Sequence, residues 1–238
     1  MTTVTRISIA SIGRRRQSLG ETIQSLAGQA DLFRIYLNGY KEGVPSYLRA
    51  SNVKVTTSAK HGWRGAESKF WWLSREPLED VYEITCDDDI IYPPDYVRRM
   101  VEKVEEYKRR AIICVHASTL LEPMDSYVGQ RKVYMFEEAL AQDTSAHVPG
   151  TGTCVWHSST MRFEMQQFES MNMCDIWVGL ACQQQSVPVI AIERPARWLR
   201  QSFAGPGIFE ETTKDDSIQT NVVKRVWPWK LGSLETRT

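Results

Sequence analysis

The chain has 238 residues, a formal net charge of zero, 42% hydrophobic residues and 24% charged residues. This composition is typical of one large folded α/β domain or two small ones, and it excludes a largely disordered chain. A chain without net positive charge does not attract polyanions through its overall field. The composition therefore gives no reason to expect nucleic acid as a partner.

Strands and helices are predicted to alternate in the first half of the chain. Apolar, β-rich runs predict strands at residues 4–10, 33–37, 53–56, 81–86 and 111–115. Apolar residues at helical spacing predict helices at residues 19–26, 66–73 and 95–107. Because this alternation implies crossover connections, the predicted fold class is α/β, with a mostly parallel central sheet flanked by helices.

The alternation breaks after residue 116. Residues 117–150 show few clear elements, which is typical of a longer excursion or a binding region. A strand is predicted at 153–157, a helix at 176–184 and a buried strand at 187–192. Residues 201–238 are expected to be a C-terminal tail.

The cysteines and the hydropathy pattern indicate a cytoplasmic protein. The five cysteines form no CxxC pair and are expected to be reduced core thiols. No signal peptide is visible at the N-terminus. No apolar stretch approaches the ~20 residues of a membrane span.

Three consecutive aspartates, residues 87–89, follow the predicted strand 81–86. Ligands bind beyond the carboxyl ends of strands in parallel sheets, where segment 11–16 and Asn38 are also expected. Side chains alternate along an extended chain, so Asp87 and Asp89 are predicted to face one cleft while Asp88 points away. Such carboxylates repel each other unless a divalent cation binds them, and their oxygens suit Mg²⁺ or Mn²⁺. The alternative is an acidic loop that caps the following helix.

An apolar strand followed by Asp-x-Asp, a proline and an aromatic residue before a helix resembles the metal-binding turn of GT-A glycosyltransferases. The preceding order of strand, basic loop and a helix containing TIQSLAGQ (residues 22–29) is similar to family 2 of these enzymes. The resemblance covers residues 4–115 well and 147–200 more loosely. It implies a single Rossmann-like GT-A domain in which residues 1–116 bind a nucleotide sugar and residues 117–200 bind the acceptor and carry the catalytic base.

The resemblance also implies a donor site. The loop after the first strand would contact the nucleotide, and Asn38 stands where family members usually carry an acidic residue that reads the base. Asp87 and Asp89 would be metal ligands, with no histidine after residue 157 to supply a third. Arginines beyond the last strand are expected either to reach the diphosphate or to be solvated surface charges. The predicted donor-binding residues are Ser11, Gly13, Arg14, Arg15, Asn38, Gly62, Arg64, Lys69, Asp87, Asp88, Arg194 and Arg197.

The resemblance implies an acceptor site in the second half of the chain. HVPGTGTCVWH (residues 147–157) resembles the turn and strand of an acceptor pocket, and residues 171–194 resemble the helix whose N-terminal carboxylate is the catalytic base. Asp175 would take the proton of an acceptor hydroxyl from a distance of ~3 Å. Its alternative role is the N-cap of a helix beginning at residue 176. The predicted acceptor-binding residues are Gly150, Thr151, Gly152, Trp156 and Trp177.

Eight tryptophans are an unusually large number for this length. Sugar rings pack their C–H faces on aromatic rings, and Trp156 and Trp177 are the predicted platforms. The Trp71-Trp72 pair is expected in the core. The aromatic and basic segment 224–230 is either a packed tail or a peripheral membrane contact. The tryptophans in segments assigned to the site are Trp63, Trp71, Trp72, Trp156 and Trp177.

The leading hypothesis is therefore a metal-dependent, inverting glycosyltransferase that uses Mn²⁺ or Mg²⁺. It would move a sugar from a nucleotide-diphosphate sugar, expected to be UDP-linked, to a glycan or lipid-linked hydroxyl at the inner face of the membrane, as in polysaccharide biosynthesis. One alternative is a sugar-phosphate nucleotidyltransferase, whose usual Gly-rich GxGTR-like loop is replaced here by ASIGRRRQS. Another alternative is a non-catalytic sugar-nucleotide-binding module. The sequence does not indicate the donor sugar, the acceptor or the oligomeric state.

Overall fold

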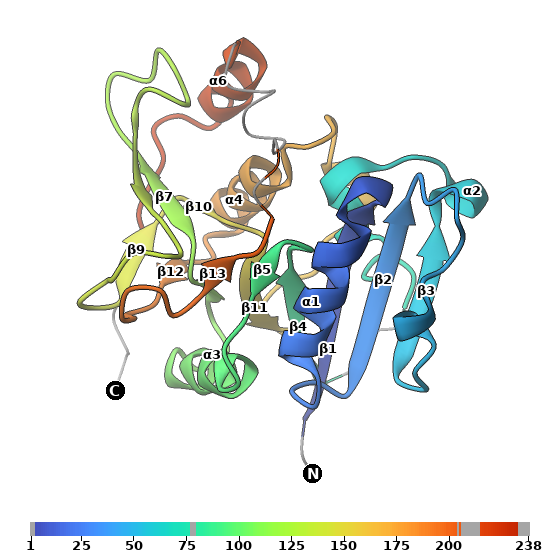
Figure 1. Ribbon diagram of the computed structural model, residues 1–238. Helices are drawn as coiled ribbons and strands as arrows, with labels where there is room; N and C mark the ends of the chain where they lie inside the picture. Colours follow the sequence, from blue (N-terminus) through green and yellow to red (C-terminus); the bar gives the residue numbers. More distant parts are fainter. Residues whose placement is uncertain (1–2, 77–79, 204, 206–214, 233–238) are drawn as a thin grey trace.

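The computed structural model describes residues 3–76, 80–203, 205 and 215–232 (Figure 1). It confirms an α/β fold built on a central sheet with the strand order β3-β2-β1-β4-β11-β6-β12-β9. The strands of this sheet are β1 (Val4–Ile12), β2 (Leu32–Asn38), β3 (Val53–Thr57), β4 (Val81–Cys86), β6 (Ile112–Cys114), β9 (Thr144–Ala146), β11 (Thr153–His157) and β12 (Val189–Ala191).

The order of the parallel strands creates a switch point at β1. This strand pairs in parallel with β2 on one side and with β4 on the other. The chain therefore leaves β1 toward one side of the sheet and later returns to its opposite side. The loops that follow β1 and β4 diverge at this point, and such crevices are where open α/β sheets bind their ligands.

Helices cover both faces of the sheet (Figure 1). On one face, α1 (Arg16–Leu26) and α3 (Tyr96–Glu106) bury their apolar sides in a core that includes Ile7, Ile35 and Ile84. On the other, a second core joins Phe70 of the 3₁₀ turn η3 (Gly65–Phe70) to α4 (Cys174–Gln185). The helix predicted at residues 66–73 is thus a shorter 3₁₀ turn, which the left-handed Gly65 (φ +58°) separates from the preceding loop.

Residues 117–150 contain short strands that the sequence pattern did not predict. Strands β7 (Ala117–Leu120), β8 (Arg131–Tyr134) and β10 (Val148–Pro149) form a three-stranded antiparallel sheet. A separate two-stranded ribbon pairs β5 (Ile90–Ile91) with β13 (Arg200–Gln201). Runs of two to four residues are too short to show a period of two. The remaining short turns are η1 (Gly13–Arg15), η2 (Ser46–Leu48), α2 (Ser58–His61) and η4 (Met165–Gln167).

The described part of the C-terminal tail packs on the body of the protein. Helix α6 (Ser217–Lys224) and Trp229 share an apolar cluster with Trp177 of α4. Trp229 is only 7% exposed, and its Nε1 donates to the carbonyl of Val223 at 2.9 Å. This contact agrees with the packed-tail interpretation of segment 224–230. No described helix is both long enough and apolar enough to cross a membrane.

The predicted core location of the cysteines is confirmed. All five thiols are buried, and none forms a disulfide. Two of them, Cys86 and Cys114, lie on central strands of the sheet.

Candidate functional site

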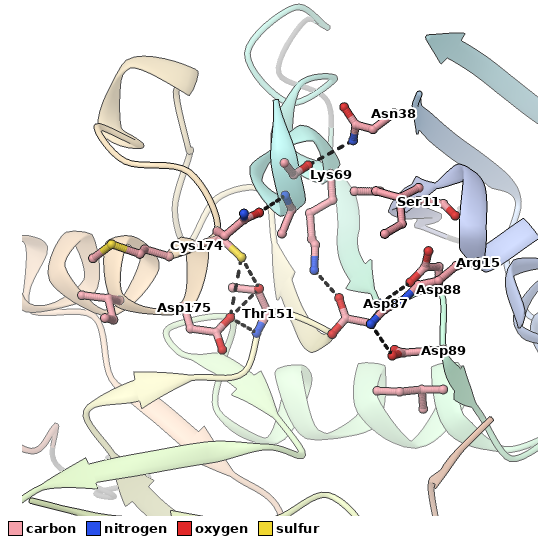
Figure 2. Close-up of a pocket in the computed structure, with 18 of the residues that line it drawn as sticks. Ser11, Arg15, Asn38, Lys69, Asp87, Asp88, Asp89, Thr151, Cys174 and Asp175 are labelled. Atoms are coloured by element: carbon pink, nitrogen blue, oxygen red, sulfur yellow. Dashed lines mark hydrogen bonds and ion pairs between the residues drawn. The ribbon is translucent and has the colours of Figure 1, made fainter. Parts of the chain in front are cut away.

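A cavity of about 430 Å³ opens at the switch point of the sheet. It is lined by Ser11 near the end of β1, by Arg15 of the following turn η1, and by all three aspartates that follow β4. Thr151 and Asp175 line its other side. Figure 2 shows Lys69 and Asp87 in the middle of the cavity, between Asp175 on one side and Arg15 on the other. Side chains predicted from segments far apart in the sequence therefore share one cavity.

The three aspartates interact with two cationic side chains. The Lys69 ammonium pairs with Asp87, and Arg15 donates to Asp88 at 2.8 Å while its other terminal nitrogen lies 3.1 Å from Asp89 (Figure 2). Lys69 is only 2% exposed, whereas the Asp87 side chain is 41% exposed. Alternation along a strand predicted that the Asp88 side chain points away from the cavity, but Asp88 lines it. The alternation does not apply because β4 ends at Cys86 and the aspartates follow in a turn.

Burial and the charges of neighbouring groups shift the pKa values of the three aspartates. Burial, followed by the neighbouring charge of Asp87, raises the pKa of Asp89 to about 7, although Arg15 opposes the shift. Burial also raises the pKa of Asp88. Burial would raise the pKa of Asp87 too, but the Lys69 ammonium outweighs it and the pKa is lowered. One further positive charge near Asp89 would stabilise its ionised form.

The donor set of this cluster suits a hard divalent cation. Within the described residues, no three His, Cys, Asp or Glu side chains are already arranged as a metal site. Carboxylate oxygens are nevertheless the ligands that Mg²⁺ and Mn²⁺ prefer, with phosphate oxygens and water completing the shell. The partly exposed Asp87 and Asp89, whose pKa is raised, fit such a cation, while Lys69 pairs with Asp87 and Arg15 with Asp89.

Asp175 lies in the first turn of α4 and is held by Thr151. Its Oδ1 accepts from the Thr151 backbone N–H at 2.9 Å and from the Thr151 hydroxyl at 2.6 Å. No hydrogen bond from the described residues reaches its other oxygen, Oδ2. The helix begins at Cys174 and its N-cap residue is Met173, so Asp175 is not the N-cap that the sequence suggested. Its carboxylate is fixed in direction and faces the cavity (Figure 2).

Asn38 lines the cavity at the end of β2, but its polar atoms are engaged within the protein. Its Nδ2 donates to the carbonyl of Gly65 at 3.2 Å and to the hydroxyl of Ser68 at 3.0 Å. Its Oδ1 accepts from the backbone N–H of Arg64 at 3.2 Å. Both amide hydrogens are therefore used to hold the segment 64–68 in place.

Several predicted site residues do not line the cavity. Arg194 is 4% exposed, and its guanidinium donates to the backbone carbonyls of Met135, Glu138 and Ile192. Because the Arg194 guanidinium is bonded to these carbonyls outside the cavity, it is not placed to bind a diphosphate there, as was predicted. The predicted residues outside the cavity lining are Gly13, Gly62, Arg64, Gly150, Gly152, Trp156, Trp177, Arg194 and Arg197.

The two predicted sugar platforms are core residues. Trp156 and Trp177 are each 2% exposed. The Trp156 Nε1 donates to the carbonyl of Met161, and the Trp177 Nε1 donates to the carbonyl of Ser170. Their rings are covered by other side chains, so neither has a face available to a sugar in this structure.

Gly150 and Gly152, which precede β11, leave space for side chains at or near the site. A Cβ at Gly152 would lie 2.0 Å from Oδ2 of Asp87, and a Cβ at Gly150 would lie 2.6 Å from the ring of His116. Such distances are far shorter than a van der Waals contact. Gly152 therefore provides the space that the Asp87 carboxylate occupies.

The cavity also contains residues that no sequence pattern indicated. Arg131 comes from β8, with its guanidinium 4.6 Å from the centre of the Tyr127 ring. Gln219 comes from α6, in the segment expected to be only a tail. Lining residues missed by the sequence interpretation include Tyr127, Val128, Arg131, Phe136, Gln201 and Gln219.

Comparison with known proteins yields distant structural similarities but no family. No protein-family model and no curated protein matches this sequence. A nucleotidyl transferase from Methanothermobacter thermautotroptrophicus has 11% identity and a TM-score of 0.48, covering 82% of this chain and 89% of that one. A manganese complex of a Mycobacterium tuberculosis protein has 19% identity and a TM-score of 0.36, covering 48% of this chain and 64% of that one. Similarities at this level do not distinguish one activity from another.

Proposed function

We propose that the protein is a nucleotide-dependent transferase that works with Mg²⁺ or Mn²⁺, and that the transferred group is a sugar. The observation that carries this proposal is a single cavity with two chemically different ends. Three aspartates, among them Asp89 with its raised pKa, lie at the switch point of the sheet. The carboxylate of Asp175, which Thr151 holds by hydrogen bonds, faces the same cavity.

The acidic end of the cavity fits the diphosphate of the donor. Asp87 and Asp89 would hold the cation, which when bound neutralises the negative charge that develops on the leaving diphosphate. Arg15 and Lys69 add fixed positive charge beside the carboxylates. Arg14, in the same loop and lining the cavity, is placed to contact phosphate oxygens.

The other end fits an acceptor hydroxyl. In the proposed step the acceptor oxygen attacks the anomeric carbon of the sugar, the bond from that carbon to the diphosphate oxygen breaks, and the bonding electrons leave with the diphosphate. Asp175 would take the acceptor proton on Oδ2. Thr151 holds Oδ1 with two donated hydrogen bonds, which orients the carboxylate for this role. Direct displacement of this kind inverts the anomeric configuration.

Sugar-phosphate nucleotidyl transfer is the second candidate. In that reaction a sugar phosphate attacks the α-phosphate of a nucleoside triphosphate, and pyrophosphate leaves. The observation in its favour is that four basic residues line the cavity, enough to bind more than one phosphate group. An attacking phosphate is already ionised, however, and needs no base. The orientation of Asp175 therefore favours glycosyl transfer to a glycan or lipid-linked hydroxyl.

The products distinguish the two reactions. The protein is incubated with Mn²⁺ and a panel of sugar nucleotides, and separately with nucleoside triphosphates and sugar 1-phosphates. Release of nucleoside diphosphate supports glycosyl transfer, and release of pyrophosphate supports nucleotidyl transfer. Asp175→Asn should retain donor binding while glycosyl transfer falls by about 10²- to 10⁴-fold. Full transfer by this variant would show that Asp175 is not the base.

A further inference from the structure

Trp63 is the largest exposed apolar side chain of the cavity. Its side chain lines the cavity next to Asn38 and Gly65 and is 55% exposed. The buried indoles of Trp156 and Trp229 donate their N–H groups to backbone carbonyls. Trp63 instead lines the cavity with more than half of its surface exposed.

The segment that carries Trp63 is fixed on both sides. Asn38 holds the backbone that follows it through the Arg64 N–H and the Gly65 carbonyl. On the preceding side, the Tyr36 hydroxyl donates to the carbonyl of Gly62 at 2.7 Å. Although the indole is exposed, the backbone on both sides of it is therefore fixed by hydrogen bonds from Tyr36 and Asn38 of β2.

The ring of Trp63 packs against the backbone of Gly39. A Cβ at Gly39 would lie 2.8 Å from Cζ3 of Trp63, so the ring edge rests on the bare backbone of this residue. Gly39 has φ +64° and directly follows β2. A larger residue at position 39 would be strained and would also displace the indole.

The position of Trp63 relative to the acidic cluster fits the length of a nucleotide. β2 and β4 both pair with β1, so their ends are separated by two strand spacings, about 10 Å. The acidic cluster follows β4, and Trp63 rests on the residue that follows β2. The ribose and α-phosphate of a nucleoside diphosphate span such a gap when the β-phosphate is at the carboxylates.

We propose that Trp63 is the stacking platform for the nucleobase, and that Asn38 is a positioning residue for this platform rather than a reader of base edges. This inference rests on the proposed nucleotide-dependent function and deepens it. Stacking accepts any base because every base has an aromatic face. The protein should therefore discriminate weakly between pyrimidine and purine nucleoside diphosphates.

Calorimetric titration with UDP, ADP and inorganic pyrophosphate, each with Mn²⁺, tests the platform. Trp63→Ala should weaken UDP and ADP binding about 5- to 100-fold, the effect of removing one base–aromatic stack. Pyrophosphate lacks a base, so its affinity should stay within about twofold. Trp63→Phe keeps a ring and should restore most of the nucleotide affinity. Equal UDP affinity in the wild type and Trp63→Ala would overturn the proposal.

Asn38→Asp tests the positioning role separately. An aspartate that reads the base would change the ratio of UDP to ADP affinity. An aspartate that cannot donate to Gly65 and Ser68 would release the Trp63 segment and weaken both nucleotides alike. We expect the second result, and a changed UDP-to-ADP ratio with unchanged UDP affinity would refute it.

The same titrations separate this inference from the proposed function. If the wild type binds neither nucleoside diphosphate, the proposed function fails, and the inference fails with it. If the wild type binds UDP and Trp63→Ala binds it equally well, only the platform is refuted. Because Trp63 is exposed, its replacement should leave the thermal unfolding midpoint nearly unchanged, which circular dichroism checks.

Discussion

The affinity of the acidic cluster for a divalent cation should depend on pH through Asp89. Burial and the charge of Asp87 raise the pKa of Asp89 to about 7, so a cation must compete with a proton for this carboxylate. A single group with this pKa is about nine-tenths ionised at about pH 8 and about one-tenth ionised at about pH 6. We therefore expect Mn²⁺ to bind about tenfold more weakly at the lower pH.

The assay is a titration of the ligand-free protein with Mn²⁺ at several pH values and constant ionic strength, with free Mn²⁺ counted by electron paramagnetic resonance. Asp87 should add little to the slope, because the Lys69 ammonium lowers its pKa and keeps it ionised over this range. Asp89→Asn is the control, and should bind Mn²⁺ more weakly at every pH and nearly independently of pH. A wild-type affinity that is flat between about pH 6 and 8, or a variant with the wild-type slope, would refute the reasoning.

Two further predictions concern the surroundings of Asp87. Gly152→Ala places a Cβ 2.0 Å from the Asp87 carboxylate and should reduce Mn²⁺ affinity, as measured by the same titration, whereas Gly20→Ala, whose Cβ has Tyr47 as its nearest neighbour at 3.4 Å, should leave it unchanged. Equal Mn²⁺ affinity in both variants would exclude Asp87 as a ligand. Lys69→Met leaves the Asp87 charge without its buried partner and should lower the free energy of unfolding by about 2 kcal/mol, less than for a fully buried pair because the carboxylate is 41% exposed. Urea denaturation near neutral pH measures this loss, and an unchanged midpoint would show that solvent already compensates Asp87.

The sequence alone predicted the framework of the first half of the protein. Strand β4 lies at the predicted residues 81–86, and β2 is one residue longer at each end than the predicted 33–37. Their apolar runs are long enough to show where buried segments begin and end, and turn residues such as the Asn38-Gly39 pair mark their limits. The alternation of strands and helices then determines a parallel arrangement, because crossover connections leave few other solutions.

The meeting of the acidic cluster with the loop after β1 also followed from the sequence. Once β1 and β4 are recognised as neighbouring parallel strands, the residues after each must lie at the same edge of the sheet. The placement of Asp175 in the same cavity had a different origin, since it depended on resemblance to a family. Its hydrogen bonds to Thr151 could not be read from the chain, because they join two turns that are close only in the folded protein.

The tertiary structure alone decided which aromatic and basic side chains reach the cavity. Trp156 and Trp63 have the same chemistry, yet one is 2% exposed and the other 55%. Arg194 was a candidate for the diphosphate but is enclosed by carbonyls, while Arg131, in a segment without a clear pattern, lines the cavity. Local sequence determines secondary structure through periodicity and turn residues. Exposure depends on which distant elements pack against a side chain, and only the assembled fold specifies that packing.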